Sequence, residues 1–103
     1  MNTEAYKKDP LRFALNLAYA QAMTGKGKER HGDDNPFVEQ VSMSITKAIG
    51  LAYPLGQAWK KADEAQRMPK EAAIRELLGA INYLAIAIIH LIDGGKEVEN
   101  GKS

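Results

Sequence analysis

The chain has 103 residues and a mass of 11.3 kDa, which is the size of one domain. Fourteen Lys and Arg against thirteen Asp and Glu leave a formal charge of +1, which excludes a strongly basic protein that coats nucleic acid and an acidic mimic of DNA. Because cysteine is absent, a disulfide framework, a thiolate zinc site and a cysteine nucleophile are excluded as well. The charged N-terminus has no apolar run behind it, so we expect a cytoplasmic protein without a secretory signal.

Three helices and one long loop account for most of the sequence. The first helix is predicted over 9–23, because Asp9 is a good N-cap, proline favours the first helical position, and apolar residues follow at helical spacing. Three glycines and many polar residues then predict a loop over 24–35.

A second helix is predicted over 36–67. It begins at Asn35-Pro36, which repeats the combination of an N-cap residue and proline seen at Asp9, and its apolar residues recur at spacings of three and four. Pro54 lies inside this pattern without changing its phase, so we expect a kink there rather than a break. The apolar positions of this second-helix seam are Val38, Val41, Ile45, Ala48, Ala52, Leu55, Trp59 and Ala62.

A third, very apolar helix is predicted over 69–93, followed by a tail over 94–103 that we expect to fray. Its heptad seam alternates isoleucine with leucine at spacings of three and four. The fold class is therefore all-α, as a three-helix bundle forming a single domain over 1–103. The residues of the third-helix seam are Ile74, Leu77, Ile81, Leu84, Ile88 and Leu91.

Residues 77–92 are apolar almost all round, and such a helix must be buried on every side. A membrane span needs about 20 apolar residues, and this shorter run also contains Asn82 and His90, so we favour a soluble helix. Two helices of the same chain cover two of its faces, so we expect the third-helix seam to be covered by another subunit of a homo-oligomer. A stripe of Ala73, Ala80 and Ala87 suits close helix contact. The alternative is a monomer in which the third helix is central.

The loop is a candidate phosphate site, because glycines let backbone N–H groups turn toward an anion and basic side chains add charge. The alternative is a solvated connection between helices. A metal site at His31 with Asp33 and Asp34 has no diagnostic spacing, so no metal and no cofactor are predicted. The predicted phosphate-binding residues are Lys26, Lys28, Arg30 and His31 in the loop, with Lys60 and Lys61 of the second helix.

No catalytic residue is predicted, because the serines are scattered and no nucleophile elbow occurs. Asn82 and Gln57 are candidates for interior polar residues, with Asn82 fixing register or partner. We expect His90 in the core or at a helix end. The aromatic residues at helical spacing are expected to be core or interface anchors; they are Tyr19, Tyr53, Trp59 and Tyr83.

The segment from Arg75 to Leu84, with its Glu-Leu-Leu-Gly run, resembles the second metal-binding helix of the all-α MazG-like nucleotide pyrophosphohydrolases. The resemblance implies a helical hairpin and, in the family, magnesium held by acidic pairs on adjacent helices. Here only Glu76 is in place. Gly79 or Ala80 stands where the family has Asp, so the hairpin is expected without the activity.

The stretch from Gly25 to Ile89 also resembles small proteins encoded by tailed phages and prophages. The matching landmarks are Gly-Lys-Gly-Lys-Glu-Arg-His at 25–31, Pro-Phe-Val-Glu-Gln at 36–40, Gly-Gln-Ala-Trp-Lys-Lys at 56–61, and 76–84. This resemblance implies an accessory protein acting in the host cytoplasm, including action against host defence.

The sequence thus leaves three functions open. The first is a non-enzymatic helical oligomer that binds a phosphate-bearing, nucleotide-like small molecule. The second is a protein–protein inhibitor or adaptor of a host factor, docking through the third helix or the second-helix seam. The third is a divergent MazG-like pyrophosphohydrolase. No membrane and no specific nucleic acid is expected as a partner.

Overall fold

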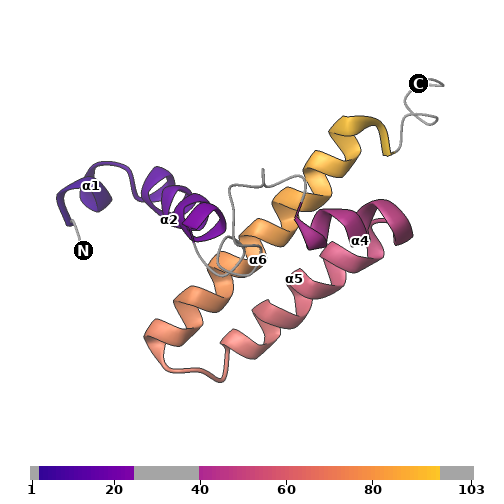
Figure 1. Cartoon of the computed structure of the whole chain (residues 1–103). Coiled ribbons are helices and arrows are strands. Elements are labelled where there is room, and N and C mark those ends of the chain that lie inside the picture. The colour runs from indigo at the N-terminus through magenta and orange to yellow at the C-terminus, as the bar shows by residue number, and fades with distance from the viewer. Residues whose placement is uncertain (1–2, 25–39, 96–103) are drawn as a thin grey trace.

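The computed structural model describes residues 3–24 and 40–95, and every regular element in these two ranges is a helix (Figure 1). The predicted all-α class is therefore confirmed. The helices are α1 (Thr3–Lys8), α2 (Pro10–Thr24), α4 (Val41–Ile49), α5 (Ala52–Ala65), α6 (Lys70–His90) and the π-helical turn η2 (Leu91–Gly95).

The predicted start of the first long helix is confirmed. The Arg12 backbone N–H donates to Asp9 Oδ1 at 3.1 Å, so Asp9 caps the free N–H groups at the start of α2. The short helix α1, which precedes Asp9, was not predicted from the sequence. An edge-to-face contact between Tyr6 and Phe13, with ring centroids 5.8 Å apart, holds α1 against α2.

The helix predicted over 36–67 is not continuous in its described part. It breaks between α4 and α5 at Gly50, whose φ of +91° and ψ of −168° suit glycine and strain other residues. Pro54, where we predicted a kink, is the third residue of α5, and a proline costs no hydrogen bond in a first turn because the N–H groups there have no helical partner. The break therefore comes from the glycine and not from the proline.

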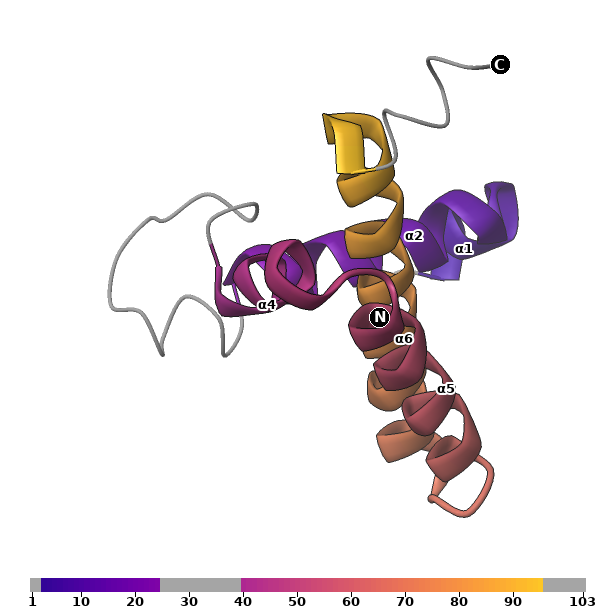
Figure 2. The same cartoon turned by 90° about the vertical axis from the view of Figure 1, so that its right-hand side faces the viewer.

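Helices α5 and α6 form an antiparallel hairpin joined by a tight turn (Figures 1 and 2). The Met68 N–H donates to the Ala65 carbonyl at 3.2 Å, which continues the hydrogen bonding past the end of α5. Pro69 then takes an extended backbone and starts α6. Ala58 and Ala65 of α5 are buried, and Tyr53 meets Tyr83 of α6 edge to face at 5.9 Å.

Helix α2 crosses α6 on a different side from α5 (Figures 1 and 2). The Asn82 side-chain amide donates to the Ala18 carbonyl at 2.9 Å, and Gln21 Nε2 donates to the Arg75 carbonyl at 3.4 Å. Asn82 is half-buried and fixes where α2 crosses α6. The expected interior role of Asn82 is thus seen within one chain.

Candidate functional site

The main candidate site is the third-helix seam on α6, which one chain leaves largely open. Five of the six seam residues are 36% to 56% exposed, and the sixth, Ile81, is half-buried. Isolated exposed leucines are normal on protein surfaces, but a contiguous apolar row along one helix marks an interaction face.

The seam is open because the other helices pack elsewhere on α6. Tyr83 contacts α5, and Gly79 lies beneath Lys61 of α5. Tyr83 and Ile81 are two residues apart, which places them about 200° apart around an α-helix. At 100° per residue, the seam isoleucines lie about 140–180° from Tyr83 and the seam leucines about 80–120° from it, so the seam lies beside and opposite the face that α5 covers.

The alanine stripe of α6 behaves differently from the seam. Ala80 and Ala87 are buried within the single chain, at 7% and 6% exposure, and Ala73 is half-buried. The stripe does allow close helix contact, as predicted, but two of its members already use that contact inside the chain. The face left for a partner is therefore the row of larger Ile and Leu side chains.

A second apolar surface lies on the outer side of α5. Leu55 is 45% exposed and Trp59 is 77% exposed, so the α5 part of the second-helix seam turns away from α6, while Pro54, Ala58 and Ala65 turn inward. Trp59 is thus not a core anchor. Of the residues three and four positions from Trp59, only Asp63 is charged, so helical spacing gave no signal that this face turns outward. A shallow hollow of about 390 Å³ is lined by Gly56, Trp59, Lys60 and Asp63.

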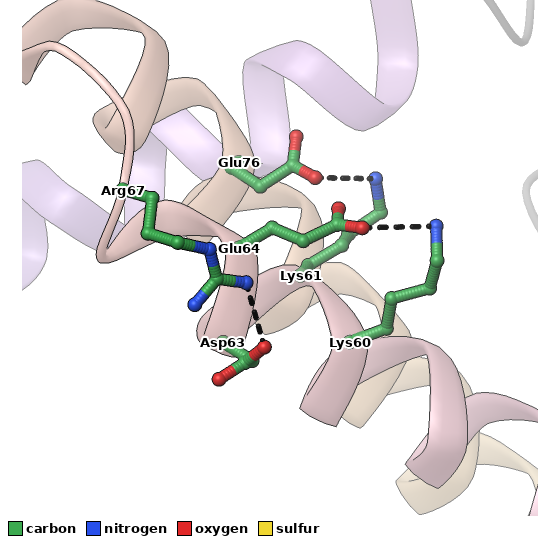
Figure 3. A network of polar contacts seen from close by, with 6 residues as sticks. All are labelled: Lys60, Lys61, Asp63, Glu64, Arg67 and Glu76. Carbon is green, nitrogen blue, oxygen red and sulfur yellow. Dashed lines mark hydrogen bonds and ion pairs between the residues drawn. The ribbon is translucent and has the colours of Figure 1, made fainter.

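The two lysines of α5 that are predicted to bind phosphate each pair with a carboxylate (Figure 3). Lys60 Nζ lies 3.3 Å from Glu64 Oε2 within α5, and Lys61 Nζ lies 3.8 Å from Glu76 Oε2 across the hairpin. Lys61 also lies 5.9 Å from the centroid of the Tyr83 ring. Both of these lysines therefore have an intrachain partner, and Lys61 links α5 to α6.

Arg67 makes the closest ion pair of this cluster. Its Nη2 donates to Asp63 Oδ2 at 2.8 Å, one helical turn apart (Figure 3). This hydrogen bond, together with the attraction of the guanidinium charge, lowers the pKa of Asp63 and raises the pKa of Arg67. The pair has the favourable i,i+4 spacing and stabilises the end of α5.

The remaining candidate residues are those of the predicted loop and His90. Lys26, Lys28, Arg30 and His31, with Asp33 and Asp34, lie outside the described residues. His90 is the half-buried last residue of α6. Within 3–24 and 40–95, no group of three or more His, Cys, Asp or Glu side chains is placed to hold a metal ion.

By length and composition alone, the stretch Lys70–Gly94 passes as a membrane span, with a mean hydropathy of 1.7. Only 17% of the 18-residue window that has this hydropathy is buried inside the chain. The open apolar surface of α6 is thus what needs an explanation.

No family model matches the chain, and no curated protein or solved structure matches it either. The phage origin and the likeness to MazG-like enzymes therefore stay predictions.

Proposed function

We propose that this protein is a non-enzymatic binding protein that acts as a helical homo-oligomer, assembled through the α6 seam. The observation that carries the proposal is the continuous row of open Ile and Leu side chains on the side of α6 away from α5. A helix that is apolar on this side as well as on its inner sides is stable in water when a partner covers it.

The size of the seam is suited to reversible assembly. Complete burial of one Leu or Ile contributes about 1.5–3 kcal/mol, and most seam residues keep a third to a half of their surface open. Covering the rest in two copies thus yields on the order of 10 kcal/mol. Association costs about 4–15 kcal/mol in lost translational and rotational freedom, so the seam supports a dimer whose population depends on protein concentration.

Size-exclusion chromatography with light scattering tests this assembly directly. We expect a mass at a multiple of the 11.3 kDa chain that falls toward the monomer mass on dilution. A mass of one chain at every concentration, up to the highest that stays in solution, would overturn the proposal.

The ligand of this oligomer is proposed to carry phosphate, and the support for this is the glycine-rich basic sequence over 25–31. Thermal shift against a panel of nucleotides tests it, since a ligand at 100 times its Kd raises stability by about 2.7 kcal/mol. We expect joint substitution of Lys26, Lys28 and Arg30 by Ala to remove the shift. The matched control is Lys47→Ala, an exposed lysine of α4 that is outside the predicted phosphate-binding set. No shift with any nucleotide counts against a phosphate ligand and leaves the assembly unaffected.

The second candidate function, an adaptor or inhibitor that docks a protein, is favoured by one specific observation. Trp59 is 77% exposed beside the open Leu55, and aromatic side chains of this kind anchor protein interfaces. Trp59 is also the only tryptophan in the chain, so its fluorescence reports on the α5 outer face alone. We expect dilution of the oligomer to leave its emission maximum unchanged. A partner protein docked on α5 shifts the emission to the blue, and Trp59→Ala weakens that partner's binding.

A further inference from the structure

We propose that the N-terminal half of α2 is a second part of the assembly surface, in which Leu11 and Leu15 pack on helix α6 of a second copy of this chain. This inference rests on the proposed assembly through the α6 seam and adds a contact that the seam by itself does not make. It is carried by the way in which α2 crosses α6 and continues beyond it.

The face of α2 that packs on α6 extends past the end of that contact. Ala18 is on this face and is 2% exposed, and its carbonyl accepts the hydrogen bond from Asn82 of α6. Leu11 comes seven residues earlier, about 20° from Ala18 around the helix, so it belongs to the same face. Leu11 is nevertheless 69% exposed, and Leu15 is 48% exposed. The N-terminal half of α2 thus projects beyond α6 with its inner face open.

Helix α1 packs on a different side of α2. Its contact with α2 is the edge-to-face pair of Tyr6 and Phe13, with ring centroids 5.8 Å apart. Phe13 is two residues from Leu11, which places the two side chains about 200° apart around α2. Helix α1 therefore supports α2 from behind and leaves the face of Leu11 open.

The open half of α2 extends over the side of α6 on which the seam lies. Tyr83 faces α5; around α6, Ile86 is about 60° to one side of it and Leu84 about 100° to the other. Ile86 is 4% exposed and Leu84 is 46% exposed, so α4, which also packs against α6, covers the side of Ile86. Figure 2 shows α4 on one side of α6, and α1 with the N-terminal half of α2 on the other. This half of α2 is thus on the side of Leu84.

A second copy on the seam lies where the open face of α2 points. Packed helices have axes about 8–10 Å apart, and seven helical residues span about 10 Å. Because α2 runs across α6 (Figure 2), Leu11 is displaced from α6 by about the distance to a partner helix on the seam. The same face of α2 already packs on α6 within the chain. Its open continuation therefore suits the α6 helix of the second copy.

Leu11→Glu tests this contact, with Ala20→Glu as the matched control. Ala20 is an exposed residue of the same helix, about 160° from Ala18, so the control places the same charge on the far side of α2. A symmetric dimer carries each substitution twice. We expect Leu11→Glu to raise the Kd of the oligomer about 10- to 100-fold and Ala20→Glu to leave it within a few-fold. Sedimentation velocity gives the Kd, and far-UV circular dichroism checks the fold.

Photo-crosslinking locates the contact without adding a charge to the helix. The full chain carries p-benzoylphenylalanine at position 11 or, as the control, at position 20. It is irradiated at a concentration where light scattering shows the oligomer. We expect position 11 to give covalent dimers whose crosslinked peptide, identified by mass spectrometry, comes from residues 70–95 of the second copy. Position 20 gives no such dimers.

The results separate the α2 contact from the assembly itself. An oligomer in which position 11 gives no covalent dimer, or crosslinks to another part of the second copy, overturns the α2 contact and leaves the seam assembly standing. A Kd of folded Leu11→Glu within a few-fold of the parent protein overturns the contact too. A monomer by light scattering at every concentration overturns the proposed assembly and this inference with it.

Discussion

Replacement of Leu84 by Glu is the sharpest test of assembly through α6. Leu84 is in the middle of the seam and 46% exposed, so the single chain buries about half of it. Covering the rest contributes about 1 kcal/mol in each copy. A symmetric dimer carries the substitution twice and therefore loses about 2 kcal/mol, which corresponds to about 30-fold in Kd.

The charge of the new side chain adds to this loss. An ionised carboxylate pressed against isoleucine side chains gives up water contacts without gaining a hydrogen bond. We therefore expect Leu84→Glu to raise the Kd of the oligomer at least about 100-fold at neutral pH.

Leu55→Glu is a closely matched control. It makes the same chemical change at a residue that is 45% exposed, but on the outer face of α5. We expect it to leave the Kd of the oligomer within a few-fold of the parent protein.

Sedimentation velocity over a dilution series gives the Kd of both variants, and far-UV circular dichroism checks that each one folds. If Leu84→Glu loses helical signal, Ile88→Glu, at a residue 56% exposed, replaces it. An unchanged Kd in a folded Leu84→Glu protein, or a larger loss in Leu55→Glu, refutes the assignment of the interface to α6.

The remaining predictions concern stability, measured by urea unfolding at one fixed protein concentration. Gly50→Ala destabilises the fold by about 1–3 kcal/mol because φ is +91° at this position, whereas Gly56→Ala, in an open helical position, stabilises it by up to about 1 kcal/mol; equal effects contradict the assigned break. Asn82→Ala costs about 1 kcal/mol through the lost bond to α2, and no loss shows that this bond does not hold the crossing. Arg67 lowers the pKa of Asp63, so the ionised Asp63 stabilises the folded state above the ordinary Asp pKa, and this contribution disappears as the pH falls through the lowered value. Asp63→Asn therefore has a small effect on the free energy of unfolding at neutral pH and none in strong acid. An equal effect at both pH values excludes the ion pair as its cause.

The sequence by itself determined the all-α class and the course of the long helices, but neither the short helix α1 nor the division between α4 and α5. Local chemistry predicts features that depend on a few neighbouring residues, without knowledge of the tertiary structure. These features are the Asp9 cap, the start of α6 after Pro69 and the 3.5-residue period of the seams. The sequence also determined that α6 carries more apolar surface than two neighbouring helices cover.

Only the tertiary structure decided which apolar rows face inward. Helix α5 carries a regular row with Leu55 and Trp59 and a less regular row with Ala58 and Ala65, and the small residues face α6 because they let the two backbones approach closely. The break at Gly50 is also visible only in the structure. A glycine within an apolar helical pattern is compatible with a continuous helix, whereas its φ of +91° ends α4 here. Periodicity identifies the rows on a helix, but the choice between them depends on the shape of the neighbouring helix, which lies far away in the sequence.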